Sequence, residues 1–257
     1  MRFRSLGSGS SGNATLIEAG SGRSTSRLLV DCGFGIRQLE SRLARAGLQC
    51  SDLDAIFITH EHADHIGCAL SLARRASIPL WMSRGTHAAL GAPELDGLLR
   101  FARDGEAISI GDLQATPFTV PHDAREPLQL CCSDGQRKLG ILTDLGHASS
   151  HVIQHLQDCN ALLLECNHDL AMLDQSAYPP FLKARVGGRF GHLCNEDAAA
   201  IAVAVAHGRL GQVVAAHLSE HNNRPELARA ALAGALGRAD HEVLTASAAS
   251  GTDWLGV

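Results

Sequence analysis

Short apolar runs alternate along the chain with segments whose apolar residues are spaced three and four apart. The runs rich in branched residues predict strands at residues 15–17, 28–30, 54–59, 78–81, 161–164 and 213–216. The wider spacing predicts helices over residues 35–46, 195–207 and 225–236, and one from a histidine cluster to about Ala76. Between residues 107 and 143, turns at Gly111-Asp112 and Asp134-Gly135 predict consecutive strands. Asn195, followed by two acidic residues, is expected to cap its helix.

Both halves of the chain place strands before helices, and no repeat, low-complexity segment or linker separates them. This order is typical of an α/β fold in which two sheets pack together with helices outside them. We therefore expect a single domain over residues 1–257.

Composition and charge narrow the cellular setting. The 257 residues include 22 Lys+Arg and 27 Asp+Glu, for a formal net charge of −5. No apolar run reaches the roughly 18 residues that a membrane span needs, and no apolar segment typical of a secretory signal follows Met1. Eight cysteines without a CxxC pair favour reduced thiols and a cytoplasmic location. We expect no membrane partner.

A mildly acidic chain that binds nucleic acid needs a local basic surface. A solvated face is the commoner explanation for any single arginine. The candidates for such a surface are Arg23, Arg27, Arg125, Arg185 and Arg189.

The segment Thr59–His65 concentrates ligand-type side chains directly after a predicted strand. A turn there can direct His60 and His62 to one metal ion, and Asp64 and His65 to a second. Imidazole and carboxylate donors suit Zn²⁺, Mn²⁺ or Fe²⁺. A polar loop with incidental histidines is the simpler alternative, but four such side chains within six residues disfavour it.

This HxHxDH pattern resembles the signature of the metallo-β-lactamase superfamily. The resemblance implies a four-layer αββα sandwich with a dinuclear site at one edge, between two mixed sheets flanked by helices. It also implies three further ligands at strand ends, which His122, Asp144 and His217 match in order. Asp31 resembles a residue that braces the ligand loop, although it is equally suited to forming a turn.

Seven nitrogen and oxygen ligands would hold two divalent ions, Zn or Mn with Fe or Ni as further candidates, about 3.5–4 Å apart with a hydroxide between them. That arrangement performs hydrolysis. Flavodiiron proteins carry Glu where this chain has His62, so an O₂ or NO reductase is disfavoured.

Three polar stretches indicate what is hydrolysed. The glycine-rich segment 7–13 can form an anion-binding nest with Ser10, Ser11 and Asn13, or simply a hairpin. His192 precedes a predicted helix, where a phosphate oxygen binds well. The residues Ser219, His221 and Asn222 surround the last expected ligand and either bind substrate or are merely solvated.

These stretches resemble the YycJ/WalJ family of phosphodiesterases over essentially the full chain. The matching elements are Ser8–Asn13, Thr59–His65, His122–Ala124, Thr143–Gly146, Asn167–Asp169, Gly191–Asn195 and His217–Asn222. His168 and Asn195 thereby become candidates for the substrate pocket, although a structural hydrogen bond explains His168 equally well. Cys194 departs from the serine that is usual in the family.

The resemblance implies a metal-dependent exonuclease that digests double-stranded DNA from the 5′ end, with DNA-repair proteins as partners. In this mechanism His192 stabilises the extra negative charge and protonates the leaving oxygen, while Asp64 orients the hydroxide. The main alternative is a small-molecule hydrolase such as a glyoxalase II-like thioesterase or a lactonase. A third hypothesis is a metal-stabilised binding or regulatory protein without turnover, which the complete ligand set disfavours.

Overall fold

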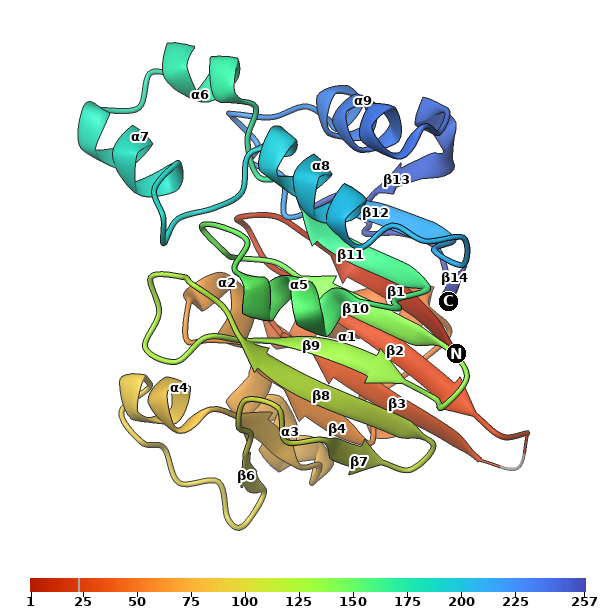
Figure 1. Cartoon of the computed structure of the whole chain (residues 1–257). Helices are drawn as coiled ribbons and strands as arrows, with labels where there is room; N and C mark the ends of the chain where they lie inside the picture. The colour runs from red at the N-terminus through yellow and green to blue at the C-terminus, as the bar shows by residue number, and fades with distance from the viewer. Residues whose placement is uncertain (23) are drawn as a thin grey trace.

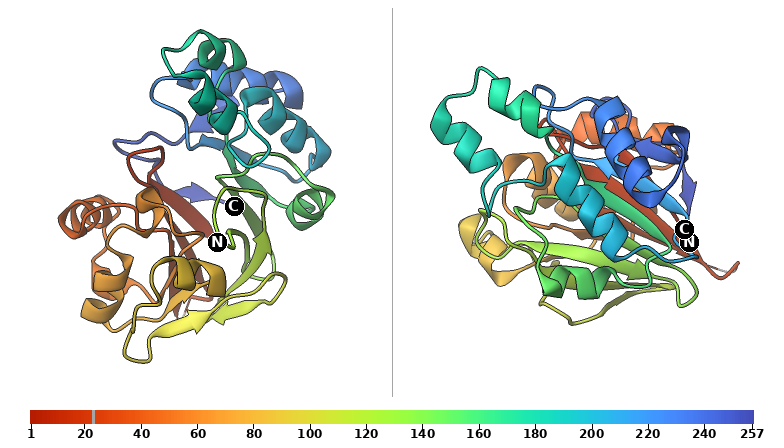
Figure 2. Two further views of the ribbon diagram at one scale, coloured as in Figure 1. Left: turned by 90° about the vertical axis from the view of Figure 1, so that its left-hand side faces the viewer. Right: turned by 45° about the horizontal axis from the view of Figure 1, so that its top comes forward.

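Two seven-stranded sheets pack face to face and carry helices on their outer faces (Figure 1). The computed structural model describes residues 1–22 and 24–257, so the predicted contribution of Arg23 lies outside the described residues. The four layers are clearest in the left view of Figure 2, where the two sheets lie side by side between their helices. This arrangement confirms the predicted αββα sandwich.

The first sheet is built from the N-terminal half and closes with the C-terminus. Helices α1 (Ile36–Arg45) and α3 (Ala69–Ala76) pack against its outer face. The short helices α2 (Ala63–Ile66) and α4 (Arg84–Ala89) follow strands of the same sheet. The strand order is β14 (Leu255–Gly256), β1 (Arg2–Gly7), β2 (Ala14–Gly20), β3 (Thr25–Val30), β4 (Ala55–Phe57), β5 (Leu80–Met82) and β6 (Leu99–Phe101).

The second sheet follows in sequence. Helices α5 (Ser150–Leu156), α8 (Asn195–Ala204) and α9 (Pro225–Leu236) cover its outer face. Helices α6 (Leu170–Gln175) and α7 (Pro180–Val186) project beyond them. The strand order is β13 (Val243–Thr245), β12 (Gln212–Ala216), β11 (Ala161–Glu165), β10 (Lys138–Leu142), β9 (Leu128–Ser133), β8 (Leu113–Thr119) and β7 (Ile108–Ile110). Two 3₁₀ turns, Cys50–Asp52 and Asp240–Glu242, complete the described elements.

Alternating side chains of each strand separate the core into layers. Leu28 and Val30 belong to the cluster between the two sheets, whereas Leu29 between them faces the helices. On the second sheet, Leu163 faces inward while Leu162 and Leu164 contact the outer helices. A strand that is buried on both faces reads as a continuous apolar run, which is the pattern that the sequence presents here.

The parallel strands determine where chemistry can be placed. Strands β3, β4, β5 and β6 are parallel to one another, as are β10, β11, β12 and β13. The carboxyl ends of parallel strands lie at one edge of a sheet, and ligands bind outside that edge. The loops that follow β4, β8 and β10 gather on the left in Figure 1.

Several local predictions need correction. Cys194, not Asn195, caps helix α8: its Sγ accepts a hydrogen bond from the Asp197 amide, and Asn195 is already helical. The helix expected after the histidine cluster is interrupted at Gly67, whose backbone is not helical, with φ at 31° and ψ at −112°. Glycine is required there, since a Cβ would lie 2.3 Å from the Cys32 carbonyl oxygen. The strand prediction missed β1, β6, β13 and β14, and the helix prediction missed α4, α5, α6 and α7.

The cysteines and the helices bear on the setting of the chain. All eight cysteines are free, and all but Cys50 are buried. In the part of the chain that the structure describes, no helix has both the length and the apolar surface needed to cross a bilayer.

Candidate metal centre

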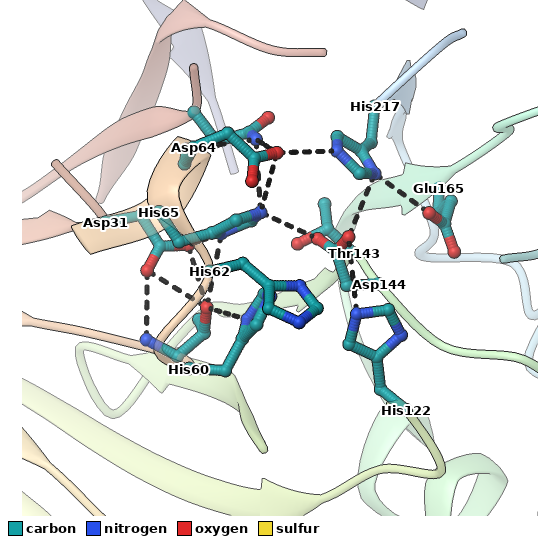
Figure 3. Close-up of polar contacts among 12 residues, drawn as sticks. Asp31, His60, His62, Asp64, His65, His122, Thr143, Asp144, Glu165 and His217 are labelled. Carbon is teal, nitrogen blue, oxygen red and sulfur yellow. Dashed lines mark hydrogen bonds and ion pairs between the residues drawn. The ribbon is translucent and has the colours of Figure 1, made fainter. Parts of the chain in front are cut away.

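Seven side chains that are distant in the sequence meet between the two sheets at this edge (Figure 3). Four come from the loop and helix after β4, and the others follow β8, β10 and β12. They are His60, His62, Asp64, His65, His122, Asp144 and His217, the set expected from the sequence.

The seven form two overlapping groups around one carboxylate. Donor atoms of His60, His62 and His122 lie within 4.8 Å of one another, and so do those of Asp64, His65 and His217. Asp144 belongs to both sides: its Oδ2 lies 3.1 Å from His65 Nε2, and its Oδ1 lies 3.9 Å from His122 Nε2. A carboxylate in that position can bridge two ions.

The ring orientations are fixed from outside the cluster. Nδ1 of His65 donates to Asp31 at 2.8 Å, and Nδ1 of His122 donates to the Gly191 carbonyl oxygen at 3.0 Å. His60 Nδ1 lies 3.0 Å from the Thr59 hydroxyl, which also contacts Asp31. When Nδ1 is held in this way, Nε2 is presented to the centre as a neutral ligand.

The protein alone does not satisfy these inward atoms. Nε2 of His60, His122 and His217 and Oδ2 of Asp144 are buried, and none has a well-aligned hydrogen bond to any described residue. Buried polar atoms without partners are rare and each requires an explanation. Four that converge on one small volume, with mixed imidazole and carboxylate chemistry, fit divalent metal ions.

The comparisons with known proteins agree with this geometry. The profile of the beta-lactamase superfamily domain matches residues 26–217. The chain belongs to this superfamily. Within it, the chain is 35% identical to exodeoxyribonuclease YycJ of Bacillus anthracis over 233 residues, or 89% of this chain and 86% of that protein. It is 33% identical to exodeoxyribonuclease WalJ of Streptococcus pneumoniae over 244 residues, covering 93% and 89%. The chain therefore belongs to the YycJ/WalJ family, and the resemblance found in the sequence is confirmed.

A solved structure supports the fold assignment. The metallo-β-lactamase fold protein YhfI of Bacillus subtilis superposes with a TM-score of 0.75 at 19% identity, covering 99% of this chain and 98% of that one. Together with the His/Asp cluster, the superfamily membership identifies a metal-dependent hydrolase.

The electrostatic environment differs between the two sides of the candidate metal centre. Burial, reinforced by neighbouring histidines such as His65, holds the pKa of His60 well below its ordinary value. Burial would also lower the pKa of His217, but Asp144, Asp64 and Glu165 outweigh it and raise that pKa to about 10. The metal-free site thus has a neutral histidine on one side and a carboxylate-rich region on the other, so divalent ions would compete with protons there.

Three residues of the site have a left-handed backbone, each within two residues of the end of its strand. Asp31, Asp144 and His217 have φ values of 60°, 56° and 53°. A residue with a Cβ adopts this conformation at a cost of the order of 1 kcal/mol, and such residues concentrate at functional sites. The turn redirects each side chain from the strand axis into the centre.

Glu165, the last residue of β11, was missed in the sequence. Its Oε1 accepts from His192 Nδ1 at 2.8 Å and from His217 Nδ1 at 2.9 Å. Its Oε2 accepts from the Leu145 and Leu193 amides. Burial would raise its pKa, but the histidines outweigh that effect and lower it to about 2. A carboxylate ending an otherwise apolar run is the signal that could have revealed it.

The glycine-rich loop between β1 and β2 contributes differently from what was expected. Ser10 and Ser11 are exposed, whereas Asn13 is buried under the cluster. The Asn13 amide contacts Asp64 Oδ2 at 3.3 Å and His65 Nε2 at 3.1 Å. In this structure Asn13 positions side chains of the site, and only the two serines are open to a ligand.

The remaining candidates surround the C-terminal side of the site. Asn195 is buried and exchanges two side-chain hydrogen bonds with Asn223. The Ser219 hydroxyl accepts from the Asn222 amide, while Asn222 Oδ1 and the buried His168 Nδ1 find no partner among the described residues. His221 is exposed and faces Tyr178, with 6.3 Å between ring centroids.

Proposed function

We propose that this protein is an exodeoxyribonuclease that uses two divalent ions, held by the seven side chains, to hydrolyse DNA. The observation that carries the proposal is the set of buried, unpartnered donor atoms around Asp144. The names of the curated relatives, which are exodeoxyribonucleases, supply the substrate class.

The proposed ligand sets follow the two groups of donors. His60, His62 and His122 would hold one ion, Asp64, His65 and His217 the other, and Asp144 would bridge them. Bound there, the ions would acidify a water molecule and polarise a phosphodiester, which is the chemistry that hydrolysis requires. Zn²⁺ and Mn²⁺ both suit mixed imidazole and carboxylate donors, with iron and nickel as further candidates.

His192 supplies the proposed general acid. Glu165 holds Nδ1 of this ring, and the side chain lies 3.5 Å from Asp144 while remaining partly exposed. Its Nε2 is therefore free to donate a proton to a departing oxygen at the mouth of the site. Asp64, which contacts both His65 and His217 at 3.5 Å, would orient the attacking water.

The finer features of the proposal rest on the family resemblance. They are a double-stranded DNA substrate, digestion from the 5′ end, and a cytoplasmic role beside DNA-repair proteins. The free, mostly buried cysteines support a reducing compartment.

A duplex labelled at one 5′ end tests the reaction and its polarity. With Mn²⁺ or Zn²⁺ added separately, we expect labelled mononucleotides to appear first, and no product after chelation. His62→Ala should abolish release while circular dichroism retains the folded signature. A thioester and a lactone, assayed in parallel, test the small-molecule alternative. Turnover of either without any DNA hydrolysis would overturn the proposal.

A further inference from the structure

The chain exposes two aromatic side chains in the segment between α6 and α8. Phe181 is 75% exposed and Phe190 is 59% exposed. The chain has seven phenylalanines, and the other five are buried or only partly exposed. Leaving large apolar rings in water is unfavourable, so two exposed rings in one short segment indicate a ligand surface.

The segment around these rings is cationic in an otherwise acidic chain. Residues 175–195 contain Lys183, Arg185 and Arg189 but no Asp or Glu. Phe181 and Arg185 lie four positions apart on α7, so they share one face of the helix. An aromatic ring and a guanidinium on one exposed face match the base and the phosphate of one nucleotide.

Direct contacts connect this segment to the proposed ligands. Arg185 Nε donates to Asp123 Oδ2 at 2.8 Å, and Asp123 Oδ1 lies 3.4 Å from His122 Nε2. Phe190 directly precedes Gly191, whose carbonyl oxygen accepts from His122 Nδ1. Figure 1 shows α7 projecting on the side where the loops after β4 and β8 gather.

We propose that α7 and residues 187–190 form a binding platform for the unpaired bases of the strand being hydrolysed. Phe181 and Phe190 stack on bases, and Arg185 contacts the adjoining phosphate. This inference rests on the proposed nuclease function and deepens it, because it names the form of DNA that reaches the metal centre. In this arrangement the duplex end frays as its terminal phosphodiester reaches the site between the two sheets, and the exposed rings compensate for the lost base stacking.

A binding measurement that needs no turnover tests the platform. The probe is a duplex with a short 5′ overhang, with phosphorothioate linkages that resist hydrolysis and 2-aminopurine in the overhang. Stacking quenches the fluorescence of 2-aminopurine. Phe181→Ala and Phe190→Ala should each raise Kd about tenfold and reduce quenching. Arg185→Gln should instead lower the slope of log K against log salt by about 0.7, because it removes one phosphate contact.

Matched controls lie outside α7 and residues 187–190. Leu227 on α9 is an exposed apolar residue, and Arg209 is an exposed arginine paired with Asp158. Leu227→Ala and Arg209→Gln should leave Kd, quenching and the salt slope unchanged.

Three outcomes would overturn the platform. One is that Kd and quenching are unchanged in both phenylalanine variants. Another is that these variants bind a blunt duplex, which has no unpaired bases, with the same increase in Kd as the duplex with an overhang. Sedimentation showing that the unsubstituted protein is a dimer, and the variant carrying both Phe181→Ala and Phe190→Ala a monomer, would assign the rings to a second copy of the chain. A failure of the nuclease proposal is distinguishable, because a parent protein that hydrolyses no DNA still reports stacking on the resistant probe.

Discussion

The two halves of the metal centre are built in different ways. The first sheet contributes four side chains from the six residues His60–His65, so the four are close together in the sequence as well as in space. The second sheet contributes His122, Asp144 and His217 from three separate strand ends, and Glu165 supports them from a fourth. The first half is a local motif, whereas the second exists only after the sheet has assembled.

The two halves also differ in how they are braced. In the first, Asp31 and Thr59 hold His60 and His65 through one small hydrogen-bond network. In the second, a single buried carboxylate, Glu165, holds both His192 and His217. We therefore expect substitutions in the second half to affect several functional groups at once.

The largest effect on DNA hydrolysis is expected for two substitutions of proposed ligands, Asp144→Asn and His62→Ala. Both should lower DNA hydrolysis at least about 10³-fold, because each metal interaction contributes several kcal/mol to the transition state. Their metal contents should differ. Asp144 lies between both donor groups, so its loss should release both ions, whereas His62 belongs to one group and its loss should release one. Elemental analysis after gel filtration measures this. Equal retention of both ions in the Asp144 variant would contradict the bridging position.

Removing the metals should reveal how far both halves depend on them. Since ligands stabilise the folded state by mass action, chelation should lower the free energy of unfolding by about 3 kcal/mol, or roughly 10 °C in Tm. Hydrogen exchange should increase both at residues 60–66 and at residues 217–219, because unpartnered Nε2 atoms lie in both segments. The hairpin of β7 and β8 is the internal control. An increase confined to residues 60–66 would remove His217 from the metal centre.

Substitution of the carboxylates that hold the ligand histidines, Asp31 and Glu165, should lower hydrolysis by smaller and unequal factors. Asp31→Asn and Glu165→Gln leave every proposed ligand in place, so hydrolysis should fall about 10- to 100-fold, as is usual for partners of metal-bound histidines. Glu165→Gln should have the larger effect on kcat, because it releases the proposed acid as well as a ligand. Metal affinity and kcat, measured separately, distinguish the two. A larger kcat effect in the Asp31 variant would contradict the expected asymmetry.

The same contrast explains what sequence reasoning could reach. The histidine loop was readable because its ligands are neighbours in the sequence. The parallel strands other than β6 and β13 were readable because they are continuous apolar runs. Glu165 was missed because nothing local links a strand-ending carboxylate to a histidine 27 or 52 residues away. The cap at Cys194 was missed because Asn195 has the stronger intrinsic preference for that position, while the bridge between His168 and Cys194 fixes the start of α8. Helices α6 and α7 bury few residues, so they leave little apolar periodicity to detect.

The smallest effect is expected for a residue of the first sheet that lies away from the metal-binding edge. Glu18 on β2 pairs with Arg2 and Arg27, away from the proposed ligands. Burial raises its pKa, but the hydrogen bonds and charges of these two arginines outweigh that effect and lower the pKa below its ordinary value. Its stabilising contribution is therefore complete above the unfolded pKa, near 4.5, and is lost as the pH falls through the lower folded pKa. Glu18→Gln should lower the free energy of unfolding at pH 7 by about 0.5 kcal/mol, the scale of solvent-accessible pairs, and should flatten its decline below pH 5. Urea unfolding at several pH values measures both quantities. A loss of bound metal in this variant would show that the two edges of the sheet are coupled.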